Sequence, residues 1–339
     1  MEWLQVPTNL AVTVIRALSP ARVFAFIAAA CLSLGGHAQG TFPTHTVKFI
    51  VPLPASSPPD MLARVASQKL AESWGTPVIV EVRDGAGGTI GVSQVVKAAP
   101  DGYTLLFTPD FPLVIVPAVS RAPYDPRRDL APIGAVAQGL SVLVAHPSVG
   151  IGSVKELIAA ARERPGALTF ASAGDGSTSR MCMEFIKQET EIDVVQVAYR
   201  GALPAVQAVL SGEVSMFCSP IFQALPHIKS GKLKALGVTG AKPASVIPEV
   251  PPISAQGVPS LVFGNSWYAA FAPSGTAPEV LNKIRDALKK AFDDPDVRER
   301  LTRAGLEPVW MDQEQLAAAI RSDLERWTRV AKAAGIRNE

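Results

Sequence analysis

The sequence predicts an α/β protein in which two units follow each other along the chain. Short runs rich in β-branched residues alternate with helical stretches: "VKFIVP" precedes a helix over 58–74, and "PVIVEV" precedes one over 89–98. This alternation is typical of βαβ units around a parallel sheet. A length of 339 residues suits about two domains of roughly 150 residues each. Two domains imply a cleft between them.

The second unit is predicted to begin after "AHPSVGIGS", where Ser153 caps a helix. Strands are expected at "LTFAS", "VVQVAY" and "EVSMFCS", and helices over 154–163, 178–189 and 203–211. The last part of the chain differs, because its pattern indicates helices over 279–292, 295–304 and 313–333. We expect these helices to pack back on the first unit.

The N-terminal segment is predicted to be a secretory signal peptide over residues 1–38, cut after Ala38. Arg16 and Arg22 precede the apolar run "VFAFIAAACLSLGG", and the small residues of "GHA" follow it. A transmembrane anchor is the alternative, but this run has 14 residues, whereas a membrane helix needs about 20. The mature chain is therefore expected in the periplasm and is not expected to span a membrane.

The charge balance of the mature chain argues against nucleic acid as a partner. Cleavage removes Glu2, Arg16 and Arg22 from 30 acidic and 32 basic side chains, so the formal charge falls from +2 to +1. The sequence has neither a basic stripe nor interleaved aromatic residues. The charged stretch "DLERWTRVAKAAGIR" is typical of a solvated helix face.

Two cysteines, Cys182 and Cys218, remain after cleavage. In an oxidising compartment two thiols can pair, so a disulfide is one expectation. The alternative is that both are small buried hydrophobic residues, the usual environment of a free cysteine.

The sequence lacks the residue patterns that enzymes need. The remaining histidines, His45, His146 and His227, are not spaced with other ligands as a metal site requires. The glycine-rich stretch 85–91, "GAGGTIG", places Ile90 where a dinucleotide fingerprint has its third glycine, so it indicates a tight turn. We expect no metal, no cofactor and no catalytic residues.

Two strand-to-helix corners are candidates for ligand binding. In "VPLPASSPPD", residues 51–60, Ser57 fits an N-cap, Pro58 the first helical position and Asp60 a capping box. In "ASAGDGSTSR", residues 171–180, the helix begins with hydroxyl residues and has no acid before Glu184. Helix N-termini bind anions through unpaired N–H groups and the positive end of the helix dipole. Ordinary capping is the alternative for each corner.

Many segments, in one order, resemble the Bug-type receptors of tripartite tricarboxylate transporters. They are "VKFIVPLPASSPPDMLAR", "PVIVEVRDGAGGTIG", "VVKAAPDGYTLLF", "PYDPRRDLAPIG", "FASAGDGS", "VAYRGALPAVQAVLSGEV", "ALPHIKSGKLKALGVT" and "IPEVPPISAQGVP". The resemblance covers nearly the whole mature chain. It implies a type II Venus-flytrap periplasmic binding protein, with mixed or parallel sheets and a ligand cleft between its domains. Domain I would comprise 39–144 and 265–339, and domain II 145–264, with crossings near 145 and 265.

The resemblance also implies a set of ligand contacts. Ser56 and Ser57 stand where the family usually has a Gly-Gly pair, Asp110 adds a negative charge at the cleft, and Arg180 and Arg200 are available counter-charges. The expected contacts are Leu53, Ala55, Ser56, Ser57, Asp60, Thr108, Asp110, Ser172, Ala173, Gly174, Ser177, Thr178, Ser179, Arg180, Tyr199 and Arg200. A ligand with two poles is expected, with a carboxylate on Ser177 to Ser179 and a hydrogen-bond donor facing Asp110. The alternative is that Asp110 points to solvent.

The resemblance therefore implies a monomeric periplasmic receptor that captures a small carboxylate or an amino-acid-like solute. Its two domains would close on the ligand and deliver it to two integral-membrane transporter subunits. The alternatives are a hydrolase or isomerase that works in the cleft, or a solute sensor for a signalling partner. The absence of a nucleophile and base pair in the sequence argues against the enzyme.

Overall fold

A computed structural model describes residues 42–55, 57–174, 176–261 and 266–336. The predicted signal peptide over 1–38 and Ser56 lie outside the described residues. From His45 onward the chain forms one compact unit, and this unit contains two β-sheets. No helix within these described ranges is long and apolar enough to cross a membrane.

The first sheet is mixed and has six strands in the order β11-β4-β10-β3-β1-β2. The strands are β1 (Val47–Val51), β2 (Val78–Val82), β3 (Thr104–Pro109), β4 (Leu130–Gly139), β10 (Ser266–Pro273) and β11 (Leu306–Met311). The first three are parallel to one another, whereas β10 runs antiparallel to β3 and β4, and β11 antiparallel to β4. The βαβ alternation of the sequence thus accounts for the parallel half of this sheet.

The second sheet is also mixed and has five strands in the order β7-β6-β8-β5-β9. They are β5 (Ser141–Ala145), β6 (Thr169–Ser172), β7 (Val195–Ala198), β8 (Met216–Pro220) and β9 (Lys234–Val238). Strand β6 pairs in parallel with β7 and β8, and β5 pairs antiparallel with β8 and β9. Strand β5 is apolar but for Ser141 and buried along its whole length, as expected for a strand with both faces covered.

The chain passes from the first sheet to the second at Leu140, between β4 and β5. The crossing was expected near residue 145, which is the last residue of β5, so it lies about five residues earlier than expected. The other expected crossing, near residue 265, falls in the stretch 262–265, which lies outside the described residues. A division into two domains, one around each sheet, stays our proposal.

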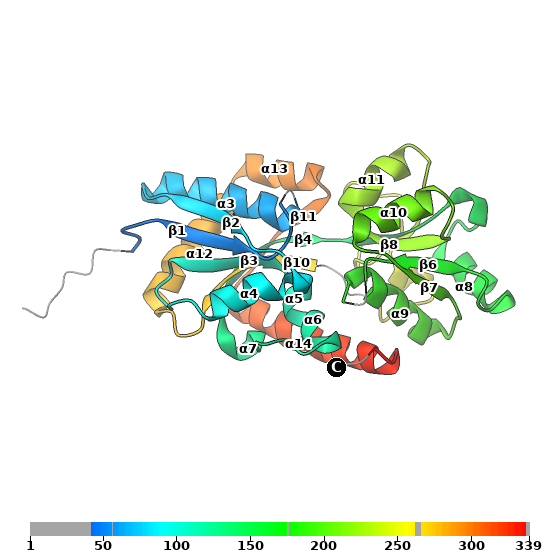
Figure 1. Cartoon of the computed structure of the whole chain (residues 1–339). Helices are drawn as coiled ribbons and strands as arrows, with labels where there is room; N and C mark the ends of the chain where they lie inside the picture. Colours follow the sequence, from blue (N-terminus) through cyan, green and yellow to red (C-terminus); the bar gives the residue numbers. More distant parts are fainter. Residues whose placement is uncertain (1–41, 56, 175, 262–265, 337–339) are drawn as a thin grey trace, which may run out of the picture. The chain divides into compact units, whose positions relative to one another are not determined.

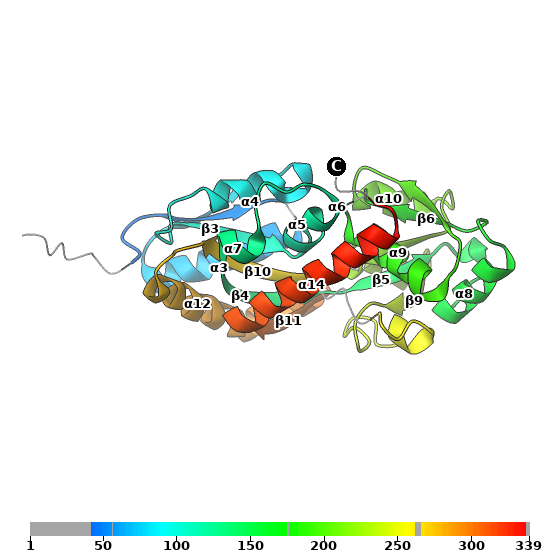
Figure 2. The same cartoon turned by 90° about the horizontal axis from the view of Figure 1, so that it is seen from below.

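Helices cover both faces of the first sheet (Figures 1 and 2). On one face lie α3 (Pro58–Trp74), α12 (Pro278–Asp293) and α13 (Pro295–Arg303), and on the other α4 (Thr89–Val96), α5 (Phe111–Val114), α6 (Val116–Val119), α7 (Pro126–Asp129) and α14 (Gln313–Ala333). The predicted bounds of 58–74 and 313–333 agree with α3 and α14. Helices α12 and α14 contact β4, so the C-terminal helices pack on the first sheet as expected.

The strand β11 was not predicted, because the sequence between α13 and α14 contains Pro308 and lacks a strand-like alternation. It lies at the edge of the sheet, where a proline does not have to donate to a neighbouring strand. Helices alone were therefore predicted for the C-terminal part of the chain.

The second sheet is covered by α8 (Val154–Glu163) and α9 (Thr178–Thr190) on one face and by α10 (Ala202–Leu210) and α11 (Ile221–Lys229) on the other. Ser153 caps α8 as predicted, since its Oγ accepts from the Glu156 N–H at 3.2 Å. Helix α9 also contacts α14, where Gln188 Nε2 donates to the Val330 carbonyl at 3.0 Å.

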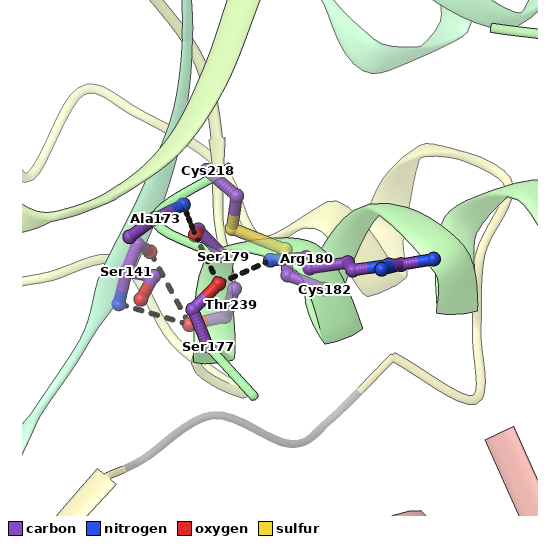
Figure 3. The surroundings of a disulfide bond; sticks show 8 residues. All are labelled: Ser141, Ala173, Ser177, Ser179, Arg180, Cys182, Cys218 and Thr239. Carbon is purple, nitrogen blue, oxygen red and sulfur yellow. Dashed lines mark hydrogen bonds between the residues drawn. A yellow bond between two sulfur atoms is a disulfide. The ribbon is translucent and has the colours of Figure 1, made fainter. Parts of the chain in front are cut away.

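Cys182 of α9 and Cys218 of β8 are joined by a disulfide in the structure (Figure 3). Their Cα atoms are 6.5 Å apart, and both side chains are buried. Because Cys182 lies in the first turn and a half of α9, the bond fixes the beginning of this helix against the sheet.

We expect Ellman-type labelling of the exported protein, denatured without reductant, to find no free thiol, and to find two after reduction. The double variant Cys182→Ala/Cys218→Ala should lower the free energy of unfolding by roughly 3 to 4 kcal/mol, the chain-entropy value for a loop of this length. Two free thiols per unreduced chain would show that the cysteines are instead buried hydrophobic residues.

Candidate functional site

A cavity of about 520 Å³ lies at the carboxyl ends of the parallel strands β1, β3, β6 and β8. This is the edge of an α/β sheet where ligands usually bind. Its polar lining residues are Ser57, Ser141, Ser177, Thr178, Ser179, Gln223, Ser266 and Tyr268. Apolar walls come from both sheets, among them Leu53, Phe111, Val116, Phe217 and Phe222. No charged side chain is among the described residues that line it.

At the β1–α3 corner, Ser57 is the N-cap and Pro58 the first helical residue, as predicted. The capping box is wrong, because the Ser57 N–H donates to the Pro54 carbonyl and Asp60 pairs with Arg64, with Nη2 and Oδ1 3.0 Å apart. The Ser57 Oγ is buried and has no hydrogen-bond partner within the described part of the chain. This hydroxyl is therefore available to a ligand.

The first helical residues of α3 are prolines, which carry no N–H. The corner at α3 can therefore offer an anion far fewer backbone donors than an ordinary helix N-terminus. At this corner Ser57 contributes a hydroxyl group, whereas Ser56 lies outside the described residues.

At the β6–α9 corner, the loop fixes the orientation of two hydroxyl groups (Figure 3). Ser177 is the N-cap: its Oγ accepts from the Arg180 N–H at 3.3 Å and donates to the Gly174 carbonyl at 2.6 Å. The Ser179 Oγ accepts from the Ala173 N–H at 3.0 Å. The network holds the loop and the first turn of α9 together.

Thr178 and Ser179 occupy the first two positions of α9 and line the cavity. Their N–H groups have no carbonyl partner within the helix, as at every helix N-terminus. The first turn of α9 carries no acidic side chain. The positive end of the α9 dipole therefore meets the cavity without an internal anion.

Helix α10 begins at the same cavity. Its N-cap is Gly201, with φ +110°, and no side chain caps it. Gly201 and Ala202 line the cavity, and the first turn of α10 contains no acid. The N-termini of α9 and α10 thus line one cavity, and α11 also begins there, with Pro220, Phe222 and Gln223 in the wall.

Of the residues that the sequence analysis expected at the ligand, the structure brings together Leu53, Ser57, Ala173, Gly174, Ser177, Thr178 and Ser179 in the cavity wall. Thr108 and Ser172 are fully buried, with the Thr108 Oγ1 donating to the Pro109 carbonyl and the Ser172 Oγ accepting from Gln196. The Tyr199 hydroxyl donates to Glu213, and Ala55 is exposed. Neither they nor Asp60 line the cavity.

The two arginines are not among the residues that line the cavity, so the lining does not support guanidinium counter-charges, which stay a prediction. Arg180 extends away from Ser177 and Ser179 (Figure 3), and its Nε lies 3.8 Å from Glu184 Oε1. Arg200 is exposed. An anion in the cavity would meet helix N–H groups rather than guanidinium groups.

Asp110 lies behind the cavity wall. It is only 4% exposed, so it does not point to solvent. Its Oδ1 accepts a hydrogen bond from the Ser266 hydroxyl, and Ser266 lines the cavity. Burial raises the pKa of Asp110 to about 7, although the bond from Ser266 acts in the opposite direction. A ligand would therefore meet Asp110 only through Ser266.

Three further residues of the cavity wall, Gln223, Ser266 and Tyr268, were not predicted from the sequence. Gln223 lines the cavity and follows β8, and its Oε1 is buried without a partner among the residues the structure describes. The strand "EVSMFCS" was predicted, and the helix that follows it could have indicated another strand-to-helix corner in the second unit. Ser266 and Tyr268 lie on β10, and no local sequence pattern indicates that β10 pairs with β3.

We expect Asp110→Asn to alter the pH dependence of stability. With a pKa of about 7 in the folded chain and about 3.9 in the unfolded chain, the folded chain binds more protons between these values. The free energy of unfolding of the wild type should therefore fall by up to about 4 kcal/mol as the pH rises from about 4 to 7. Asp110→Asn lacks this loss, so its stability relative to the wild type should rise across the window. Denaturant unfolding at several pH values tests this, and parallel curves would contradict it.

The known proteins that resemble this chain belong to one family. A family profile described as "Tripartite tricarboxylate transporter family receptor" matches residues 62–336. A "UPF0065 protein in tcbD-tcbE intergenic region" of Pseudomonas sp. (strain P51) is 35% identical over 312 residues, which cover 91% of this chain and 93% of the relative. BugT of Bordetella pertussis is 33% identical over 297 residues, which cover 87% of this chain and 91% of the relative.

Solved structures agree with this family. Rpa4515 of R. palustris with adipate has a TM-score of 0.78 and 29% identity, and the match covers 88% of this chain and 100% of that chain. MatC of Rhodopseudomonas palustris with malate has a TM-score of 0.72 and 30% identity, with 85% and 99% covered. The periplasmic binding protein BugD has a TM-score of 0.75 and 29% identity, with 88% and 100% covered.

These similarities confirm the predicted periplasmic binding protein fold. The family consists of binding proteins and not of enzymes, so the alternative of a hydrolase or isomerase in the cleft falls away. The chain belongs to the tripartite tricarboxylate transporter receptor family.

Proposed function

We propose that this chain is an exported periplasmic receptor that captures a small carboxylate or amino-acid-like solute in the 520 Å³ cavity. The observation that carries the proposal is that the N-termini of α9 and α10 both end at a cavity with no charged side chain among its described lining residues. The volume is within the range of roughly 300 to 1,000 Å³ that small-molecule sites occupy. The relatives bound to adipate and malate support a carboxylate ligand.

The carboxylate would sit on the N–H groups of Thr178 and Ser179. In a cavity closed off from water, these groups and the α9 dipole stabilise a negative charge without the desolvation cost of a buried arginine. The hydroxyl groups of Ser177 and Ser179 orient the turn, since each is already bonded within the loop.

Other residues of the cavity would bind the rest of the solute. On the first-sheet side, Ser57 offers a hydroxyl whose Oγ has no partner among the described residues. On the second-sheet side, Gln223 of α11 offers an amide that can accept or donate. Leu53, Pro58 and Phe111 would contact its carbon chain. A solute held in this way bridges residues that belong to both sheets.

We further propose that the two sheets and their helices form two domains that close on the solute by a hinge motion. The domain boundaries would be the crossing at Leu140 and the stretch that precedes β10. The closed receptor would then deliver the solute to the two membrane subunits that tripartite tricarboxylate transporters use. The family supports this role, and the receptor would act as a monomer.

The carboxylate position can be tested with Thr178→Asp, matched with Thr178→Asn. A carboxylate at this position would occupy the α9 N–H groups and repel an anionic ligand by about 4 kcal/mol for charges 4 Å apart at an effective dielectric constant of about 20. Thr178→Asp should therefore weaken binding of a carboxylate such as malate at least 100-fold by calorimetry. Thr178→Asn, which keeps the size without the charge, should stay within about tenfold of the wild type.

An acidic residue in the first turn stabilises a helix, so lost binding in Thr178→Asp would not reflect a lost helix. The thermal unfolding temperature of the two variants without ligand provides that control. Equal affinities for Thr178→Asp and Thr178→Asn would mean that the carboxylate binds elsewhere.

Export is tested by the intact mass of the protein in the periplasmic fraction of its own host. The arginines, the apolar run and the small residues of 1–38 predict cleavage after Ala38, so the mature chain should begin at Gln39. A full-length chain confined to the cytoplasm would contradict the receptor function as a whole.

A further inference from the structure

The hydrogen bond from Ser266 to Asp110 determines what the cavity wall can offer a ligand at this point. A serine hydroxyl has one hydrogen and two lone pairs. In the structure the hydrogen is donated to Asp110 Oδ1, which is not part of the cavity lining, while Ser266 itself lines the cavity. Towards the cavity, Ser266 is therefore an acceptor and not a donor.

Asp110 is held in this arrangement by its surroundings. It follows β3, and Ser266 begins β10, the neighbouring strand of the first sheet. The Phe111 N–H also donates to the Asp110 carboxylate. No cation pairs with Asp110 within the described part of the chain. Its negative charge therefore acts on the cavity through one hydroxyl group.

We propose that Asp110 and Ser266 together select a solute that carries a hydrogen-bond donor opposite its carboxylate, namely an ammonium, an amide N–H or a hydroxyl. Ser266 would contact the donor, and Asp110 would act through Ser266 as a positioning residue. The inference rests on the proposed function, because it takes the α9 end of the cavity as the site of the carboxylate.

A plain dicarboxylate fits this arrangement poorly. Its second carboxylate would face the acceptor lone pairs of Ser266, with the Asp110 charge directly behind them. Neither the ligand carboxylate nor the Ser266 oxygen would have a hydrogen to share between them. The negative charges of the ligand and of Asp110 would also lie close together in a poorly solvated wall. A donor-bearing pole would instead complete the chain from ligand to Ser266 to Asp110.

The preference should depend on pH because of the groups around Asp110. Burial raises its pKa to about 7, and the charge of Asp323 on α14 contributes in the same direction. Asp323 itself accepts from Trp267 Nε1 and is paired with Arg326 Nη1, each at 3.2 Å. Tyr268 on β10 is the other titratable group close to Asp110, and burial raises its pKa well above its usual range. Above about pH 7 Asp110 is ionised and holds the Ser266 hydrogen, so the donor preference should be strongest there.

The experiment compares three ligands of matched chain length: 5-aminopentanoate, glutaramate and glutarate. Each has one carboxylate, and the other pole is an ammonium, an amide or a second carboxylate. Calorimetry at pH 8 should give the wild type at least tenfold tighter binding of both 5-aminopentanoate and glutaramate than of glutarate. Ser266→Ala and Asp110→Asn should each reduce that ratio at least tenfold. At pH 6 the wild-type ratio should be smaller than at pH 8, and that of Asp110→Asn should not change.

Two matched variants separate this role from a general loss of structure. Ser67→Ala removes a buried hydroxyl that donates to the Val78 carbonyl, and neither residue lines the cavity, so this variant should keep the wild-type ratio. Asp323→Asn keeps an oxygen that can accept from Trp267 and removes a negative charge near Asp110. This variant should keep the wild-type ratio at pH 8, and the ratio should begin to fall at a lower pH than in the wild type.

The outcomes distinguish this inference from the proposed function. If glutarate binds as tightly as the other two, or if Ser266→Ala and Asp110→Asn keep the ratio, the donor selection is overturned while the receptor function stands. If none of the three ligands binds, or if binding is unaffected by Thr178→Asp, the carboxylate site at α9 fails and the inference fails with it.

Discussion

The proposed site depends on the first turn of α9, because the N–H groups of this turn have to stay free for the ligand. Three kinds of contact hold it in place: the cap by Ser177, the bond from the Ala173 N–H to Ser179, and the disulfide from Cys182 to β8. Each contact lies on the loop or the sheet side of the helix and none uses the N–H groups of Thr178 and Ser179. A rigid turn of this kind pays no ordering entropy when a ligand binds.

The two sheets contribute unlike surfaces to the cavity. The second sheet brings helix N-termini, at α9 and α10. The first sheet brings the start of α3, whose first two residues are prolines and carry no N–H. On the first-sheet side the polar groups are hydroxyls, those of Ser57, Ser266 and Tyr268, set among apolar residues. In the proposed function the second sheet binds the carboxylate, and the first sheet selects the shape and the donor group of the solute. A solute has to satisfy both sides at once, and a group that satisfies one alone gains only part of the binding energy.

Much of the architecture was predictable because it is encoded locally. Capping residues, terminal prolines and helical periodicity gave the bounds of α3, α8 and α14, and the hydroxyl-rich stretch 171–180 gave the corner at α9. The site residues that were misplaced depend on neighbours that the local sequence does not reveal. Arg180 is close to Glu184, one turn later on the same helix. Asp110 depends on Ser266, which is 156 residues away in the chain, and only the pairing of β3 with β10 brings them together.

Helix α14 has a consequence for how the molecule can move. It packs on β4 of the first sheet and on α9 of the second, and its Val330 carbonyl accepts from Gln188. Because α14 contacts both halves, a movement of one sheet against the other has to change the contacts of α14 with β4 or with α9. Helix α14, none of whose described residues lines the cavity, thereby couples the two sheets that form the walls of the cavity.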